Sequence, residues 1–141
     1  MSTPPLREAY ATARYRIDCG TRTIERRVGR LDADADAALA AAGCVKHWHV
    51  LTPCNPGSQP LSDDDNRARV AALHDELVPR GWTLLSALNT DADGRWPEPG
   101  FCIFDAPEDL IRSLARDHGQ LAIVGGTLGA VPQLVWIDDA E

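Results

Sequence analysis

Two polar segments of the sequence carry the side chains that are best suited to binding chemistry. The first is the turn-rich loop 55–62 with the helix start that follows it, and it supplies short neutral hydrogen-bonding groups: Asn55, Ser58, Gln59 and Asn66. At a strand-to-helix turn, free backbone N–H groups and the helix dipole favour an anion or a polar ligand beside such groups. The alternative is that these side chains satisfy their own loop backbone, which is a usual role of Asn and Ser.

The second segment is Gly94-Arg-Trp-Pro-Glu98. In it, Arg95 is suited to hold a carboxylate or phosphate, Trp96 to stack on a ligand, and Glu98 to act as an acid or base. If the two segments meet in space, they form a polar pocket with one aromatic wall. Otherwise Trp96 and Glu98 serve to pin a hairpin to the core. We therefore expect a non-enzymatic binding module for a small polar or anionic ligand or for a protein partner.

Histidines provide the catalytic alternative, a small hydrolase or transferase. In it, Glu98 is the general base, assisted by His49 or His118. His47 and His49 lie on the same side of an expected strand, as zinc sites of the H-x-H type require, so a metal there is a variant of this hypothesis. The sequence indicates no third ligand for it, and two histidines on a hydrogen-bonded strand face are the simpler interpretation. We expect no cofactor.

Two further motifs resemble ion or phosphate sites, but each lacks a required residue. The segment Asn89-x-Asp91-x-Asp93-Gly94 matches the start of a calcium loop, yet Gly100 stands at position 12, where Glu belongs. The segment 125–129, Gly-Gly-Thr-Leu-Gly, follows an apolar strand without the Lys-Ser/Thr of a P-loop or a G-x-G-x-x-G spacing. We expect a hairpin turn for the first and a plain turn for the second.

Charge restricts the possible partners. The 141 residues include 21 Asp or Glu and 14 Lys or Arg, which gives a net charge of −7. Generic binding to nucleic acid or to an acidic membrane is excluded, because both need a basic footprint. Residues 1–30 nevertheless contain seven Arg and three acidic residues. This basic edge leaves open a local acidic contact, and the acidic remainder of the chain allows a third hypothesis, a partner protein that masks a basic surface.

Cysteine usage and hydropathy point to the cytoplasm. The four cysteines form no C-x-x-C pair and no regular framework, so we expect reduced thiols. The N-terminus has no signal-peptide core, and no window approaches the ~18 apolar residues of a membrane span. The sequence does not define an oligomeric state.

The periodicity of apolar residues predicts one α+β domain over residues 1–141, in the order ββαβαββαββ. We expect a mixed or largely antiparallel sheet of about 6–7 strands with about three helices packed on it. The basic hairpin 13–28 is expected to turn at Cys19-Gly20, with Tyr15 opposite Ile24 and Arg14 opposite Glu25. The helices are expected over 31–42, from about 63 to a stop at Pro79 and Gly81, and from 105 to Gly119.

Four separated motifs resemble a bacterial family of small proteins of unknown function. In chain order these are Asn55-Pro-Gly-Ser58, Leu61-Ser62 with Asn66, Gly94-Arg-Trp-Pro-Glu98, and His118-Gly-Gln120 before an apolar strand. The resemblance covers about residues 48–125 and departs at Cys54, where the family pattern has Trp. It implies a small α/β domain with no established activity, and it adds Gln120 to the candidate ligand-binding residues.

Overall fold

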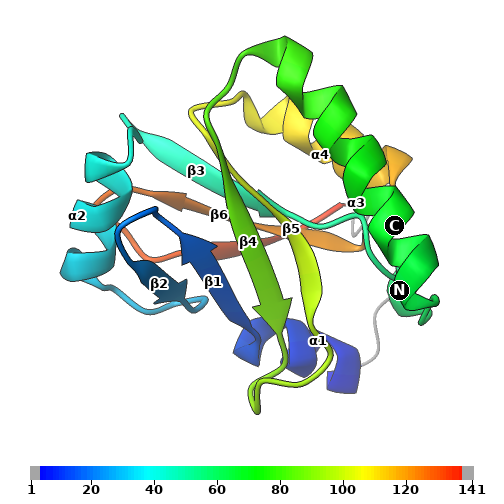
Figure 1. Cartoon of the computed structure of the whole chain (residues 1–141). Coiled ribbons are helices and arrows are strands. Elements are labelled where there is room, and N and C mark those ends of the chain that lie inside the picture. Colours follow the sequence, from blue (N-terminus) through cyan, green and yellow to red (C-terminus); the bar gives the residue numbers. More distant parts are fainter. Residues whose placement is uncertain (1–3, 138–141) are drawn as a thin grey trace.

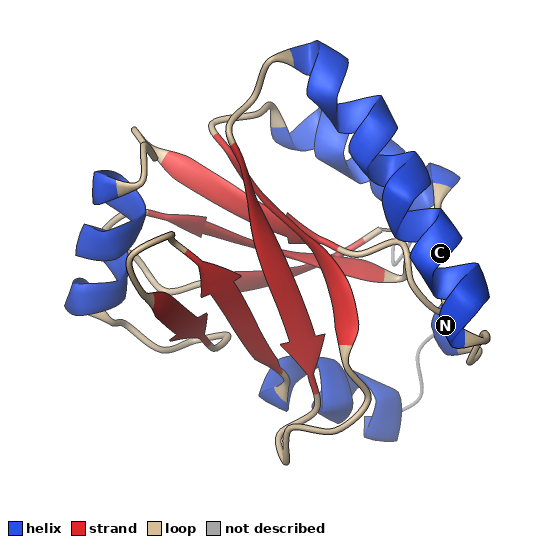
Figure 2. Cartoon of the chain, viewed as in Figure 1, coloured by secondary structure: helices blue, strands red, loops and turns tan. Residues whose placement is uncertain are grey.

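The chain forms one curled antiparallel sheet with helices on both of its faces (Figures 1 and 2). A computed structural model describes residues 4–137, with the backbone alone for residues 4–6. Its elements are α1 (Pro4–Thr12), β1 (Arg14–Asp18), β2 (Thr23–Arg26), α2 (Ala33–Ala41), β3 (His47–Leu51), α3 (Asp63–Leu77), β4 (Leu84–Thr90), β5 (Glu98–Phe104), α4 (Glu108–Asp117), β6 (Ala122–Thr127) and β7 (Gln133–Trp136). Short 3-10 turns occupy Pro56–Ser58 and Val78–Arg80.

The strand order is β2-β1-β4-β5-β3-β6-β7, and every neighbouring pair is antiparallel. The α+β class, the strand number and the order ββαβαββαββ are thus confirmed, and the sheet is antiparallel rather than mixed. Helix α1 was not expected from the sequence. No helix within residues 4–137 is long and apolar enough to cross a membrane.

Two apolar clusters hold the helices to the sheet. In Figure 1, α3 and α4 cover the face at the upper right, where Leu73 and Ile111 are fully buried. Helix α2 lies at the opposite side of the curl and contributes Leu39 to a cluster around Trp48, which is also fully buried. Helix α1 crosses the lower edge, close to the ends of β1, β4 and β5. Helices α3 and α4 therefore lie on one side of the curled sheet and α2 lies on the other, while α1 lies at an edge of the sheet.

Local capping explains where α2 and α3 start. The Asp32 side chain accepts a hydrogen bond from the Ala35 amide at 3.0 Å, which caps α2. The Ser62 hydroxyl accepts from the Asp65 amide at 3.1 Å, and α3 carries three aspartates in its first turn. Both arrangements satisfy free N–H groups and complement the helix dipole.

The predicted register of the first hairpin is wrong by two residues. Tyr15 lies opposite Arg26, and Ile17, not Tyr15, lies opposite Ile24. The turn is wider than expected because the Asp18 carboxylate binds the Gly20 amide at 2.9 Å, so the strands end at Asp18 and Thr23. Because side chains alternate along a strand, a shift of two residues leaves each on its own face, and Arg26 lies on the inner face with Ile24, where it is 1% exposed.

Arg14 and Glu25 remain ion-paired despite this shift. Their Nε and Oε1 atoms are 2.8 Å apart, although the cross-strand partner of Glu25 is Arg16. The expected charge pairing is therefore made diagonally.

The turn expected over residues 125–129 is wrong in its first part, because Gly125 and Gly126 belong to β6, and the chain turns only at residues 128–129. Gly126 lies opposite Trp48, and a Cβ on Gly126 would overlap the Trp48 indole. Gly125 lies opposite His49, whose Cδ2 would be 2.9 Å from a Cβ at position 125. The two glycines thus make room for two large rings of the neighbouring strand.

Candidate functional site

A cavity of about 380 Å³ lies between α1, the loop after β3 and the hairpin that joins β4 to β5. Its polar lining groups are Asn55, Ser58, Asn89, Thr90, Asp91 and Glu98, and its aromatic lining groups are Tyr10, Tyr15 and Trp96. The cavity therefore brings together four residues that the sequence placed in a common site, from both expected segments. They are Asn55, Ser58, Trp96 and Glu98.

Asn55 is the centre of the hydrogen-bond network in this cavity. Its Oδ1 accepts from the Leu61 amide at 2.9 Å and from Asn66 Nδ2 at 2.8 Å. Its Nδ2 donates to Glu98 Oε2 at 2.7 Å. Asn66 returns a bond, because its Oδ1 accepts from the Asn55 amide at 3.0 Å. Asn66 thus orients Asn55, and Asn55 orients the Glu98 carboxylate.

The loop that carries Asn55 is held from behind by the turn between α4 and β6. Gln120 is 8% exposed and donates from Nε2 to the Cys54 carbonyl at 3.0 Å. The Gly57 amide donates to the Gly119 carbonyl at 2.8 Å. A Cβ on Gly119 would be 2.8 Å from Pro56 Cβ, so this approach needs glycine. Gln120 therefore supports the loop instead of lining the cavity.

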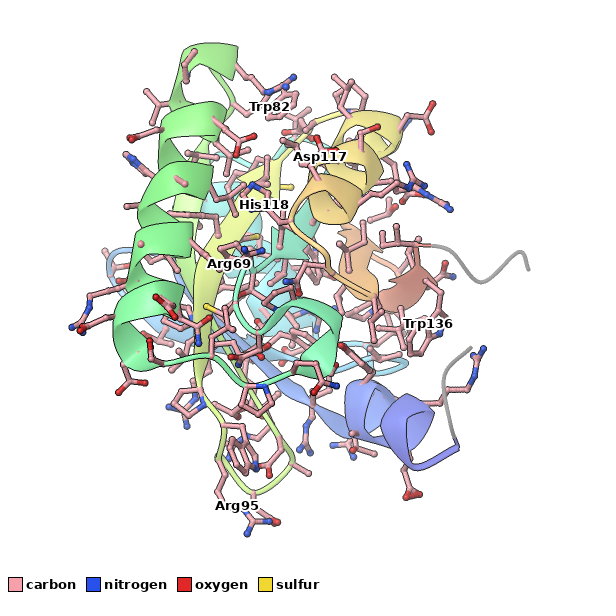
Figure 3. All side chains as sticks on the ribbon, turned by 90° about the vertical axis from the view of Figure 1, so that its right-hand side faces the viewer. Arg69, Trp82, Arg95, Asp117, His118 and Trp136 are labelled. Atoms are coloured by element: carbon pink, nitrogen blue, oxygen red, sulfur yellow. The ribbon has the colours of Figure 1, made fainter. Side chains whose placement is uncertain are left out.

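Arg69 makes a second attachment for this loop from α3. Its Nε donates to the Pro53 carbonyl and its Nη2 to the His118 carbonyl, both at 2.6 Å, as the proximity of Arg69 and His118 in Figure 3 illustrates. Three of the four motifs identified in the sequence, those at 55–58, 61–66 and 118–120, thus build one corner of the molecule, and the fourth supplies Trp96 and Glu98 to the cavity there.

Backbone strain is concentrated in the cavity wall. Asn55, Ser58 and Trp96 have φ angles of 49°, 62° and 57°, in the left-handed region that side chains disfavour. Among the described residues, Asp105 is the only other residue with a side chain and a positive φ. Its carboxylate accepts hydrogen bonds from three backbone amides, which accounts for its conformation. Strain of this kind persists where the surrounding structure holds it, and it clusters at functional sites.

Electrostatics distinguish Glu98 from the other acidic group of the cavity. Burial raises the pKa of the Glu98 carboxyl, and the hydrogen bond from Asn55 opposes this shift only in part. Asp91 is instead bound by the backbone amide of Arg95 at 2.7 Å and by its guanidinium, with Nε at 3.3 Å. Among the described residues, no Lys, Arg or His lines the cavity. Glu98 is therefore a carboxylate with no basic partner in its cavity.

Two of the hydroxyl groups that line the cavity form a separate pair. Tyr10 Oη and Ser58 Oγ are 2.7 Å apart and join α1 to the loop after β3. Burial raises the pKa of Tyr10, the bond to Ser58 lowers it, and the negative charge of Glu98 raises it further. Tyr10 thus remains a neutral hydroxyl at physiological pH and can donate or accept a hydrogen bond.

Two residues expected at the site lie elsewhere. Arg95 is 70% exposed, binds Asp91 and Asp93, and points away from the molecule at the hairpin tip (Figure 3). Gln59 is exposed and does not line the cavity. The interpretation of Arg95 as a group that holds an anion in this pocket is not supported by its position. The loop after β4 needs this arginine to balance its aspartates.

Several cavity residues were not proposed from the sequence, among them Tyr10, Tyr15 and Asn89. Tyr10 belongs to the unexpected helix α1, which packs on β7 through an edge contact between Tyr10 and Trp136, with ring centroids 5.2 Å apart. Tyr15 was expected on the inner face of the hairpin, and its burial agrees with that expectation. The sequence indicates a turn at Asn89, but this residue lies in β4, and its Oδ1 is buried without a hydrogen-bond partner.

The histidines proposed for catalysis or metal binding lie outside this cavity. His47 and His49, with ring centroids 5.6 Å apart, line a different cavity of about 360 Å³. His49 Nε2 is 3.1 Å from Glu108 Oε1, and a ring nitrogen of His47 is 2.7 Å from the Ala106 carbonyl. Burial lowers the pKa of His49, against the influence of Glu108. Within residues 4–137, no three His, Cys, Asp or Glu side chains are grouped to hold a metal ion.

The expected acid–base pairs with Glu98 are not formed. His49 lies opposite Ile103, five residues along β5 from Glu98, which corresponds to about 16 Å along a strand. His118 Nε2 is instead 2.7 Å from Glu76 Oε1 on α3. The cavity can therefore accept hydrogen bonds and stack on a ligand, but it does not offer the histidine that the hydrolase hypothesis requires.

Comparison with protein families identifies a relationship over a part of the chain that supplies most of the polar groups of this cavity. Residues 51–123, more than half of the 141 residues, match the model of a family described as "Protein of unknown function (DUF3293)". No curated protein and no solved structure matches the chain. The matched region includes Asn55, Ser58 and Glu98 and agrees with the family relationship expected over residues 48–125. The chain belongs to this family of proteins of unknown function.

Proposed function

We propose that the protein binds a small polar molecule in the cavity between α1, the loop after β3 and the β4–β5 hairpin, and that it does so without catalysis. One observation carries the proposal: three strained residues and a carboxylate with no basic partner converge on one cavity, Asn55, Ser58, Trp96 and Glu98. Its volume of about 380 Å³ is in the range of small-molecule sites.

The cost of this arrangement supports a binding role. A positive φ at a residue with a side chain costs about 1–3 kcal/mol, and here three such residues share one wall. Half-burial of Glu98 without a counter-charge is a further cost, expressed in its raised pKa. A wall that served packing alone would gain from glycine at the strained positions and from a neutral side chain at position 98.

The binding role is favoured over the hydrolase or transferase role by the surroundings of Glu98. His49 and His118 make their hydrogen bonds with Glu108 and Glu76 instead. The hydroxyl of Ser58 is hydrogen-bonded to Tyr10, which is a weak base. We also propose a cytoplasmic location, since all four cysteines are free, and three of them are buried.

Heteronuclear NMR of the protein with a library of small polar compounds tests the binding proposal. We expect ligands to shift the Trp96 indole signal together with the side-chain amides of Asn55 and Asn89. A matched pair of variants separates the cavity from the hairpin tip: Trp96→Ala should weaken binding, whereas Ala92→Gly, at an exposed position that does not line the cavity, should leave it unchanged. Ligands that shift only the histidine cavity would contradict the proposal.

A further inference from the structure

We infer that the ligand carries a primary or secondary ammonium group, which binds Glu98 inside the cavity. This inference rests on the proposed function and specifies the class of ligand. It concerns small organic amines, because the cavity is a pocket of about 380 Å³.

The first argument is the charge of the cavity lining. Glu98 and Asp91 are its acidic residues, and among the described residues it has no basic ones. Asp91 already has a cationic partner in Arg95, with Nε at 3.3 Å. The side-chain carboxylate of Glu98 has one hydrogen bond within the described part of the chain, from the neutral Asn55 side-chain amide to Oε2, so Oε1 is available to a ligand. A cation is the ligand that would balance this charge.

The second argument is the hydrogen-bonding capacity that remains in the cavity. Asn89 Oδ1 is a buried acceptor without a partner, and an unpaired buried acceptor costs about 1–3 kcal/mol. Together with Glu98 Oε1 it calls for donors, and the Tyr10–Ser58 hydroxyl pair can also accept. An ammonium group with N–H bonds supplies donors and no acceptors. A quaternary ammonium has no N–H bond to donate to Glu98 Oε1, which selects against that class.

The third argument is the aromatic lining. Tyr10, Tyr15 and Trp96 line the same cavity as Glu98, and aromatic faces attract cations by about 0.5–2 kcal/mol each. Trp96 is 70% exposed, which is unusual for a large apolar side chain, and its backbone is held at a φ of 57°. A bound organic cation would cover part of this ring and would account for its exposure in the free protein.

The position of the arginines makes an anion the wrong ligand for this cavity. Arg95, the basic residue closest in sequence to Glu98, points outward at the hairpin tip (Figure 3), does not line the cavity and pairs with Asp91 and Asp93. Four other arginines, Arg22, Arg26, Arg27 and Arg30, line a different cavity beside β2. An anionic probe would therefore be repelled by Glu98 and attracted to the β2 cavity, which gives the test an internal contrast.

The test compares three probes of similar shape: 2-phenylethylamine, 2-phenylethanol and phenylacetate. Binding is followed by NMR titration of the Trp96 indole and the Asn89 side-chain amide. We expect the amine to bind about tenfold or more tightly than the alcohol, since a hydrogen bond to a charged group is worth more than a neutral one. Phenylacetate should not shift these signals.

Two variants of the full chain complete the experiment. Glu98→Gln should reduce the affinity for the amine to that for the alcohol and leave the alcohol unaffected. Glu108→Gln is the matched control, because it makes the same change at a carboxylate of the histidine cavity, and it should leave amine binding unchanged. Thermal melting of both variants confirms that they fold.

The outcomes separate this inference from the proposed function. Alcohol or phenylacetate that binds the cavity as tightly as the amine would overturn the ammonium inference and leave the binding function standing. Unchanged affinity of Glu98→Gln for the amine would overturn the ammonium inference in the same way. Failure of all three probes and of the wider compound library to shift any cavity signal would overturn both.

Discussion

Among the cavity residues, Asn55 is the one whose side chain should contribute most to the stability of the protein. Its side chain makes three hydrogen bonds, to the Leu61 amide, to Asn66 and to Glu98, and its φ is 49°. With a net contribution of about 1 kcal/mol for each bond, loss of the side chain should destabilise the protein by about 3 kcal/mol. Alanine should cost about 1 kcal/mol more than glycine, because it has a Cβ in the left-handed region.

Three variants separate these contributions. We expect Asn55→Gly to lose about 3 kcal/mol and Asn55→Ala about 4 kcal/mol of unfolding free energy. Gln59→Ala is the matched control in the same loop, and at this exposed position it should stay within about 0.5 kcal/mol of the natural chain.

Equilibrium urea unfolding, followed by circular dichroism, measures all three changes. A loss below about 1 kcal/mol for Asn55→Ala would show that water replaces these bonds without cost. Equal or greater stability of Asn55→Ala relative to Asn55→Gly would refute the assignment of strain to this residue. Either result would remove the main reason for treating the loop as a pre-organised wall.

Three further predictions concern stability. Burial raises the Glu98 pKa in the folded state above its unfolded value, so the stability given by the protonated carboxyl is present below the unfolded pKa and is lost as pH rises through the folded pKa. Glu98→Gln should therefore raise the melting temperature at pH 7.5 and have little effect at pH 4; a lower melting temperature at pH 7.5 would contradict this. Gly126→Ala forces a Cβ into the Trp48 indole and should cost about 1–3 kcal/mol in urea unfolding, and an unchanged midpoint would refute that steric argument. Arg26 is buried, its Nε and Nη2 make no hydrogen bond, and its ion pair with Asp36 is long, with Nη2 3.8 Å from Oδ1. Arg26→Met should therefore preserve or raise stability, and a large loss of stability would show that the ion pair is strong.

The order of the strands and of α2, α3 and α4 was predictable because local signals define these elements. The Ser62 hydroxyl caps α3 by accepting a hydrogen bond from the amide of Asp65, the third residue of that helix. The Asp32 carboxylate caps α2 in the same way. The hairpin register was not predictable from side-chain pairing alone. It depends on the turn, where the Asp18 carboxylate binds the Gly20 amide and widens the loop.

The cavity was predictable only in part, because its walls come from two sources. Asn55, Ser58, Trp96 and Glu98 occur in short motifs whose residue types already indicate a polar site. Tyr10, by contrast, reaches the cavity through α1, a nine-residue helix that is too short to be stable in isolation. Its placement depends on contacts with the distant Trp136, at 5.2 Å from the Tyr10 ring and 4.8 Å from the guanidinium carbon of Arg7.

Tyr10 was missed by the sequence prediction, whereas Arg95 was predicted at the site and lies outside it. Its position directly before Trp96-Pro97-Glu98 suggested a shared site, but the turn geometry directs its side chain toward Asp91 and Asp93. Gln120 was correctly associated with the motif loop, yet it acts through the Cys54 carbonyl. In both cases the sequence identified the neighbourhood of a residue, whereas the direction of the side chain depended on the fold.

A crystal structure of the protein with its tightest-binding small polar compound tests the central claim most directly. We predict that the compound occupies the cavity between α1, the loop after β3 and the β4–β5 hairpin, within hydrogen-bond distance of Glu98 Oε1 and in contact with Trp96. A compound seated instead in the cavity of His47 and His49, or in the cavity that Val70 and His74 of α3 and Phe101 of β5 line, would contradict the account.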